Sequence, residues 1–155
     1  MFLFVLAGIV LTRINNNINM DALSVVHNYM LASSAHELHN IFNHMLDEKI
    51  DYTAGSGQRY IGKSEVELMM KPFFAKYGAS LKWETVNMFT IPSTSSFPLP
   101  PAVVEQLSVP RSVTVEVVFR RHWEDAQAGA QVADGREWIT VNDDNKITHI
   151  FVVLK

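Results

Sequence analysis

The residues best suited to acid–base chemistry lie in the segment VTVEVVFRRHWED, residues 113–125. In a β-strand, side chains alternate between two faces, so Glu116 and His122 share one face with Arg120. If that face lines a cavity, the carboxylate and the imidazole could exchange protons near neutral pH. If it faces solvent or a second subunit, the same residues would form ordinary cross-strand ion pairs. The opposite face would carry Val113, Val115, Val117, Phe119, Arg121 and Trp123.

Two histidines, His36 and His39, stand three residues apart in HELHNIFNHML, within reach of a shared metal ion on one helical face. No carboxylate or third histidine follows at a matching step, and the chain has no cysteine. We therefore expect neither a metal site nor a cofactor. The glycine of YIGKSEV, Gly62, lacks the lysine and hydroxyl pattern that a phosphate-binding loop requires, so we interpret it as a corner between a strand and a helix.

Three segments with helical spacing of apolar residues would position these groups: residues 22–32, 36–46 and 63–78. The hydroxyls of ASSA between the first two favour a break and a new helix cap, and Ser64 can cap the third. Pro72 lies inside the third segment and removes one backbone donor, which predicts a kinked or divided helix.

The rest of the chain is typical of β-structure. A short hairpin is predicted from KIDYTA and RYI around the turn GSGQ. Four longer segments rich in β-branched and aromatic residues predict antiparallel strands: 81–91, 111–123, 136–142 and 146–155. Between them we expect a proline-rich excursion over 92–110 with a helical turn at AVVEQL, a loop over 124–135, and a tight turn at NDDN.

This order of elements resembles the cone-shaped α+β fold of the nuclear transport factor 2-like superfamily, with its SnoaL-like and ketosteroid-isomerase-like members. The resemblance covers the chain from Met20 onward and is carried by VVHNYM, YIGKSEV and VNDDNKITHIFVV in their order and spacing. It implies three N-terminal helices packed on a curved, mostly antiparallel sheet that forms a cone-shaped cavity. The superfamily includes isomerases, dehydratases, cyclases and non-enzymatic binding modules, so the fold does not settle the function.

The resemblance to ketosteroid isomerase implies roles for two residues. Tyr29 stands where that family carries its oxyanion-hole tyrosine, and Glu137 where it carries a protonated aspartic acid. The position of the general base is occupied by Tyr52, and Asp51 would face the opposite side unless a bulge shifts it. From the residues alone, Tyr29 could instead pack its ring in the core. Glu137 could lie on the convex face, paired with Arg120, Arg121 or Arg136.

Length and composition suit one domain. The 155 residues are 48% hydrophobic and 19% charged, and we assign residues 20–155 to a single domain. The net charge of -3 comes without a basic stripe, so nucleic acid is not expected as a partner.

The first residues, MFLFVLAGIVL, form an apolar run about half as long as a membrane-spanning helix needs, so no stable membrane span is expected. Residues 1–19 have three interpretations: a weak signal or membrane-associating segment, an upstream extension or added residues, or an extra strand or helix. Met20 and Asp21 would make a natural start, which favours the second. We expect a cytoplasmic protein, with secretion or membrane association if residues 1–19 form a signal segment.

We therefore expect a domain that binds a small apolar ligand in a cavity lined by the aromatic residues Tyr52, Phe74, Trp83 and Phe89. If it is an enzyme, it would be an isomerase, dehydratase or cyclase that moves a proton on an apolar carbonyl compound. Tyr29 and Glu137 would stabilise an oxyanion, and the base would be Asp51, Glu116 or His122. The alternative is a non-catalytic protein-interaction module that fills the cavity with its own Met and Phe side chains and forms a homodimer through the sheet face.

Overall fold

The computed structural model describes residues 21–91 and 98–155, so the predictions for residues 1–19 and for part of the proline-rich excursion lie outside the described residues. Residues 21–34 are helical. The elements that follow are α2 (Leu38–Asn40), a π-helical turn (Ile41–Met45), β1 (Leu46–Thr53), β2 (Arg59–Ile61), α3 (Lys63–Tyr77), a 3-10 turn (Gly78–Ser80), β3 (Lys82–Thr90), α4 (Pro101–Leu107), β4 (Ser112–Asp125), β5 (Gly129–Asn142) and β6 (Ile147–Leu154). This is the α+β order that the sequence predicts.

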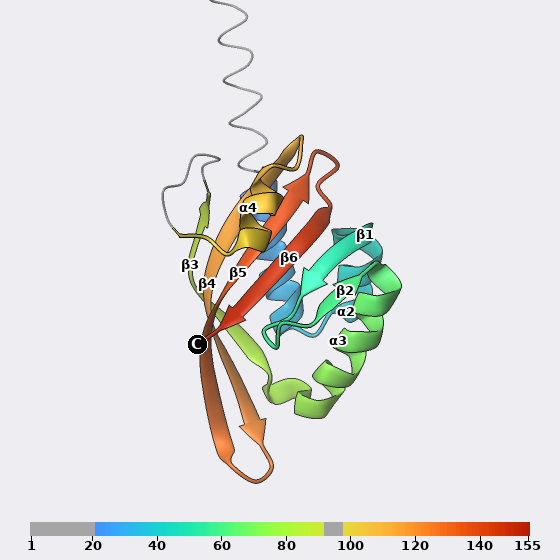
Figure 1. Cartoon of the computed structure of the whole chain (residues 1–155). Coiled ribbons are helices and arrows are strands. Elements are labelled where there is room, and N and C mark those ends of the chain that lie inside the picture. The colour runs from blue at the N-terminus through green and yellow to red at the C-terminus, as the bar shows by residue number, and fades with distance from the viewer. Residues whose placement is uncertain (1–20, 92–97) are drawn as a thin grey trace, which may run out of the picture.

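The strands form one curved, open sheet in the order β2-β1-β6-β5-β4-β3 (Figure 1). All neighbours are antiparallel except β1 and β6, which run parallel. The chain therefore enters the sheet with the short β1–β2 hairpin at one edge, crosses through α3 to the other edge, and returns strand by strand to lie beside β1.

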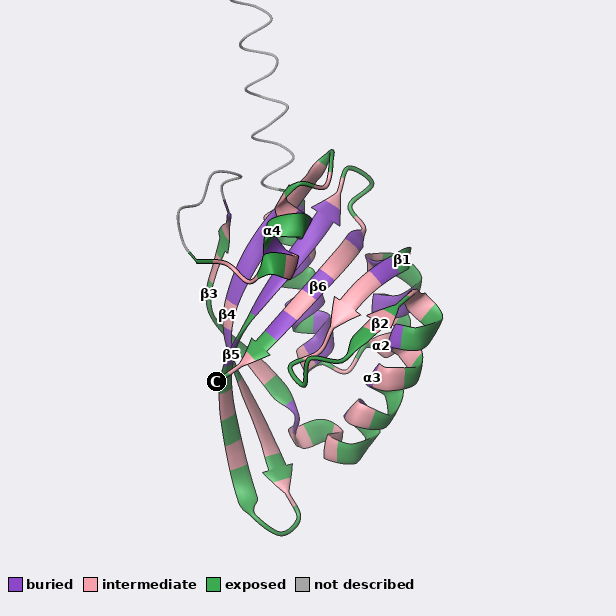
Figure 2. Cartoon of the chain, viewed as in Figure 1, coloured by how far each residue is buried: buried purple, intermediate pink, exposed green. Residues whose placement is uncertain are grey.

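Helices cover both faces of this sheet. The helix of residues 21–34 and α3 pack on the concave face and bury the main core, whereas α4 lies on the convex face over β4, β5 and β6 (Figures 1 and 2). Beneath α4, a second small cluster buries Ile91, Val103 and Trp138. The sheet thus has an apolar interior on its concave side and a partly covered convex side.

Gly62 marks the corner between β2 and α3. Its φ of 93° lies in the region that residues with a Cβ rarely adopt, and its backbone N–H donates to the carbonyl of Ile50 at 2.7 Å. The helix cap differs from the prediction, since no side chain of Ser64 caps α3. Instead, a carboxylate oxygen of Glu65 accepts a hydrogen bond from the backbone N–H of Ile61 at 2.8 Å.

Of the two outcomes predicted at Pro72, a kinked or a divided helix, the division does not occur, because α3 is a single helix of 15 residues. The proline ring leaves the carbonyl four residues earlier without its usual donor. That carbonyl belongs to Leu68, which is 75% exposed, and Pro72 is exposed as well. Water can therefore satisfy the carbonyl, and the helix continues.

The predicted loop over residues 124–135 is also wrong for most of its length. Strand β4 extends to Asp125 and β5 begins at Gly129, so the two strands form a long hairpin with a three-residue turn. Its outer end is exposed and extends beyond the helices (Figure 2). Alanine, glycine and glutamine there have little strand preference, but pairing with β4 continues in unbroken register to Asp125 and Gly129.

Among residues 21–91 and 98–155, no helix combines the length and the apolar character that crossing a membrane requires.

Candidate functional site

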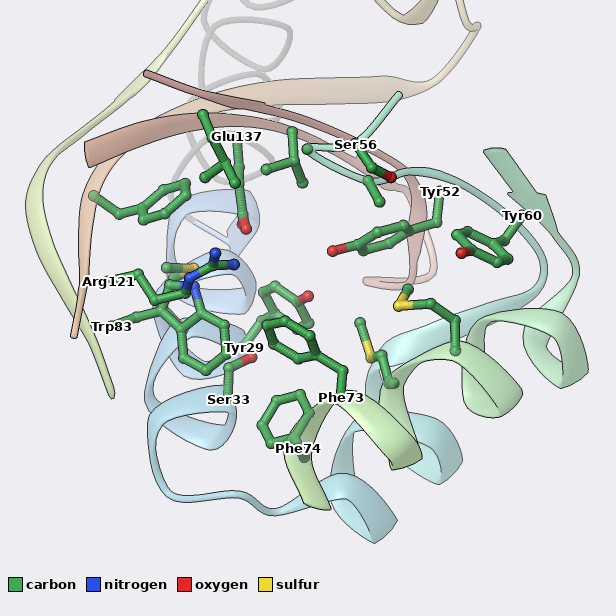
Figure 3. Close-up of a pocket in the computed structure, with 18 residues that line it drawn as sticks. Tyr29, Ser33, Tyr52, Ser56, Tyr60, Phe73, Phe74, Trp83, Arg121 and Glu137 are labelled. Atoms are coloured by element: carbon green, nitrogen blue, oxygen red, sulfur yellow. The ribbon is translucent and has the colours of Figure 1, made fainter. Parts of the chain in front are cut away.

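A cavity of about 370 Å³ lies between the concave face of the sheet, the helix of residues 21–34 and α3 (Figure 3). Its wall is mostly apolar, and a few polar groups point inward. The lining residues are Tyr29, Met30, Ser33, Tyr52, Ala54, Gly55, Ser56, Tyr60, Met69, Met70, Phe73, Phe74, Trp83, Phe119, Arg121, Glu137, Val152 and Leu154. A cavity of this size and composition is typical of a small-molecule site.

Two tyrosines bring hydroxyl groups into the cavity. Tyr29 and Ser33 stand four residues apart, on one face of the first helix, while Tyr52 comes from β1. In Figure 3 the hydroxyl of Tyr52 points toward the middle of the cavity, beside Tyr29. Burial raises the pKa of both tyrosines, and the nearby carboxylate of Glu137 raises both further. Both therefore stay protonated and act as hydrogen-bond donors.

Glu137 is the carboxylic acid of this cavity. It projects from β5, is 5% exposed, and its Oε2 atom is buried without a hydrogen-bond partner among the described residues. Burial raises the pKa of Glu137 to about 7, although the positive charge of Arg121 works in the opposite direction. At neutral pH both the acid and the carboxylate are therefore populated, as a proton-transfer group requires.

Arg121 is a cavity residue that sequence reasoning missed. It projects from β4 beside Trp83 of β3, and its guanidinium lies over the rings of Phe73 and Trp123, at 5.3 and 5.1 Å from their centroids. Burial lowers the pKa of Arg121, but an arginine retains its charge at neutral pH. The sequence does contain a sign of this role: in the alternation of side chains along the strand, Arg121 falls on the apolar face with Val117 and Phe119.

Aromatic side chains form much of the remaining wall. Phe74 lies 5.5 Å from Trp83 and 5.9 Å from Phe73 between ring centroids. Phe119 lies over Gly135 of the neighbouring strand, where a Cβ would approach its ring to 2.5 Å. Glycine at that position leaves the space that the ring occupies. The structure thus places the predicted lining residues Tyr52, Phe74 and Trp83 together.

Glu116 and His122 lie away from the cavity, on the opposite face of β4. Glu116 is buried under α4, where its two oxygens accept hydrogen bonds from Arg136 at 2.6 Å and from the indole N–H of Trp138 at 3.1 Å. His122 pairs with Glu84 across β3 and β4 at 3.1 Å. The prediction that they line the cavity as acid–base residues is therefore corrected. Both form cross-strand pairs on the outer face, because Val115, Val117 and Phe119 occupy the core face of β4.

Asp51 also points away from the cavity. Its Oδ1 accepts a hydrogen bond from Arg59 at 2.8 Å, and that bond lowers the pKa of Asp51. It lies in a separate groove on the convex side, opposite His149 in the neighbouring strand. Tyr52 occupies the cavity side of β1 at this point, since the strand places successive side chains on opposite faces. Asp51 is therefore not in position to act as a base in the cavity.

Phe89 is the predicted lining residue that the structure places elsewhere. A β-bulge between Thr85 and Asn87 shifts the register of β3, so Phe89 lies opposite Glu116 on the convex side and is 40% exposed. Simple alternation from Trp83 would have put Phe89 on the cavity side, and one inserted residue reverses that. Met88, the residue before it, packs against the main core instead.

The two histidines that could have shared a metal ion are bonded to different partners. His36 Nε2 lies 2.7 Å from the carbonyl oxygen of Leu81, and the ring of His39 is hydrogen-bonded to Asn43. Within the described parts of the chain, no three side chains of the types that bind metals lie close enough together to hold an ion.

No protein-family model matches the chain, and no curated protein sequence does. Its fold is nevertheless shared with solved structures. A candidate scytalone dehydratase from Novosphingobium aromaticivorans is similar with a TM-score of 0.68 at 10% identity, over 90% of this chain and 86% of that one. An NTF2-like protein of unknown function from Exiguobacterium has a TM-score of 0.59 at 14% identity, over 86% of this chain and 98% of that one.

A candidate isomerase of the SnoaL-like family from Agrobacterium tumefaciens is also similar, with a TM-score of 0.54 at 11% identity, over 88% of this chain and 98% of that one. At such identities a likeness shows the fold alone. The chain therefore has the nuclear transport factor 2-like fold that the sequence resemblance implies, and its chemistry must be argued from the cavity.

Proposed function

We propose that the protein binds a small molecule in this cavity and catalyses proton transfer on a carbonyl compound, as an isomerase, dehydratase or cyclase does. The observation that carries the proposal is Glu137, a buried acid with an unpartnered oxygen that faces an otherwise mostly apolar cavity beside two tyrosine hydroxyls. Structural neighbours described as a candidate scytalone dehydratase and a candidate isomerase of the SnoaL-like family are compatible with this class of reaction.

The roles differ from those that the resemblance implies. Asp51, Glu116 and His122 lie outside the cavity, so Glu137 is the carboxylate available there to accept a proton. We assign the oxyanion donors to Tyr29 and Tyr52, because both hydroxyls stay protonated beside it. In this scheme the carboxylate of Glu137 removes a proton from the carbon next to the carbonyl. The electron pair moves to the carbonyl oxygen, which accepts hydrogen bonds from the tyrosines.

The protonated Glu137 then completes the reaction. An isomerase would return the proton to a different carbon, and a dehydratase would give it to a departing hydroxyl group, which leaves as water. The pKa of about 7 suits both halves of such a cycle, because neither protonation state is strongly favoured at neutral pH.

Hydrogen–deuterium exchange tests this proposal without knowledge of the natural substrate. The protein should accelerate exchange of the protons next to the carbonyl of a bicyclic ketone such as 2-tetralone in D2O, followed by NMR. We expect Glu137→Gln to slow the catalysed exchange about 100-fold and Tyr52→Phe to slow it about tenfold or more. The His122→Gln variant, changed on the outer face, should catalyse the exchange at the rate of the natural protein. A natural protein no faster than buffer, or a Glu137→Gln variant as fast as the natural one, would contradict the proposal.

A second candidate function, the dimerising module, is favoured by apolar groups on the convex face. Phe89 is 40% and Val153 37% exposed there, and Val104 of α4 is 54% exposed. We expect the protein to sediment as a homodimer and Phe89→Arg to sediment as a monomer, because a charge would then be buried in the interface. Leu68→Arg, on the outer surface of α3, is the matched control. A natural protein that stays monomeric at high concentration would rule this interface out.

A further inference from the structure

The guanidinium of Arg121 lines the cavity and lies close to two aromatic rings. The aromatic rings of Phe73 and Trp123 cover it. A cation–π contact is not a hydrogen bond, so it leaves the N–H donors of a guanidinium free to bind a ligand. Figure 3 shows the group reaching into the cavity next to Trp83, on the side opposite Tyr52.

Arg121 has no acidic partner in the described part of the chain. Its Nε atom is buried without a hydrogen bond, and it forms no ion pair with Glu137, although both line the same cavity. The other described arginines each pair with a carboxylate: Arg59 with Asp51, Arg111 with Asp143, Arg120 with Asp134 and Arg136 with Glu116. The charges of Arg121 and Glu137 influence each other, but the two groups are not in direct contact. A partly buried cation without a directly paired carboxylate is costly, so its retention at a cavity wall points to a ligand that supplies one.

We propose that the molecule bound in the cavity is an aromatic or bicyclic acid whose carboxylate is held by Arg121. This inference rests on the proposed function and names its substrate class. The carboxylate would accept the free N–H donors of Arg121, and the apolar body would lie against Trp83 and Phe74. The other end of the molecule would reach Glu137, Tyr29 and Tyr52. The ligand is then acidic at one end, which the small apolar ligand predicted from the sequence is not.

The charges of the cavity favour a carboxylate over a phosphate. Arg121 is the only cationic side chain among the lining residues, which include no lysine and no histidine. One guanidinium matches one carboxylate in charge and in planar shape. A phosphate dianion would bring a second negative charge into the cavity that already holds Glu137, with no further cation to balance it.

Matched pairs of ligands with the same shape and different charge test the inference. We would measure binding of 2-naphthoate and 2-naphthamide by calorimetry or NMR titration at pH 7. The natural protein should bind the acid about tenfold or more tightly than the amide, since hydrogen bonds to charged groups are the stronger ones. Arg121→Met should weaken naphthoate binding about ten- to hundredfold and leave naphthamide binding nearly unchanged. Arg121→Lys should give an intermediate loss, because the charge remains while the planar fork is lost.

Arg120→Met is the matched control, because Arg120 is the adjacent residue, faces the other side of β4 and pairs with Asp134. It should leave both affinities as they are. An equal loss for acid and amide in Arg121→Met would mean that Arg121 only supports the wall, and would overturn the inference. Tight binding of the amide with no preference for the acid would also overturn the inference, but it would leave the proposed function intact. If neither compound binds in the cavity of the natural protein, both the inference and the proposed function fail.

Discussion

Glu137→Gln should be more stable relative to the natural protein at high pH than at low pH. The carboxyl has a pKa of about 7 in the folded chain, against an ordinary value of 4.5. Below pH 4.5 the carboxyl is neutral in both the folded and the unfolded chain, so its ionisation does not lower the stability. Between pH 4.5 and 7 the unfolded chain loses this proton more readily, so the natural protein loses stability as the pH rises through this window. The separation in pKa corresponds to about 3 kcal/mol, all of which is lost above pH 7.

The variant cannot ionise at this position and should escape that loss. The free energy of unfolding of Glu137→Gln, relative to the natural protein, should therefore rise by about 3 kcal/mol between pH 4 and pH 8. Urea denaturation at a series of pH values measures this difference directly. Glu124→Gln, which removes an exposed carboxylate, serves as the control and should show no such rise. Parallel stability curves for the natural protein and Glu137→Gln would show that the carboxyl is not held in this environment.

A residue that costs the protein stability at neutral pH is expected at functional sites, where activity needs a group that folding alone would not retain. The pH experiment and the exchange experiment therefore examine one carboxyl in two ways. Stabilisation together with loss of exchange would fit a proton-transfer role. Stabilisation without any effect on exchange would leave Glu137 as a buried acid that only tunes the cavity.

Much of the fold could be predicted from the sequence, because apolar spacing and turn residues act locally. The helical position of Tyr29 follows from the spacing of the apolar residues around it, and the corner at Gly62 follows from the backbone freedom of glycine. Tyr52 on the cavity side and Asp51 on the other follow from simple alternation in β1. Where neighbouring residues decide the structure among themselves, the sequence was a sufficient guide.

The remaining parts depend on contacts between strands. The bulge in β3 that moves Phe89 to the convex side is set by pairing with β4, which no local pattern in VNMFT indicates. The β5 segment that begins at Gly129 is a strand only because β4 pairs with it. Arg121 looked like one more charge in a run of two arginines, and only the covering rings and the absence of a described acidic partner mark it as a site residue.

Glu116→Ala should destabilise the protein by roughly 3 kcal/mol, in contrast to Glu137→Gln. Both glutamates are 5% exposed, but Glu116 is fully paired, with Arg136 and the indole N–H of Trp138. Alanine would leave the buried indole N–H without an acceptor and remove the partner of a half-exposed arginine. Glu116→Gln keeps an oxygen for Trp138 and should cost only about 1 kcal/mol.

The same pair of variants separates a structural role for Glu116 from a catalytic one. Because Glu116 lies under α4 on the far side of β4, Glu116→Gln should bind naphthoate and exchange ketone protons as the natural protein does. Urea denaturation gives the stability loss, and the exchange rate gives the function. A Glu116→Gln variant that folds normally but loses exchange would contradict the assignment of proton transfer to Glu137. Substitution of these two buried glutamates should therefore have opposite effects on stability. Glu116 has hydrogen-bond partners for both of its oxygens, whereas Glu137 leaves one of its oxygens unpaired.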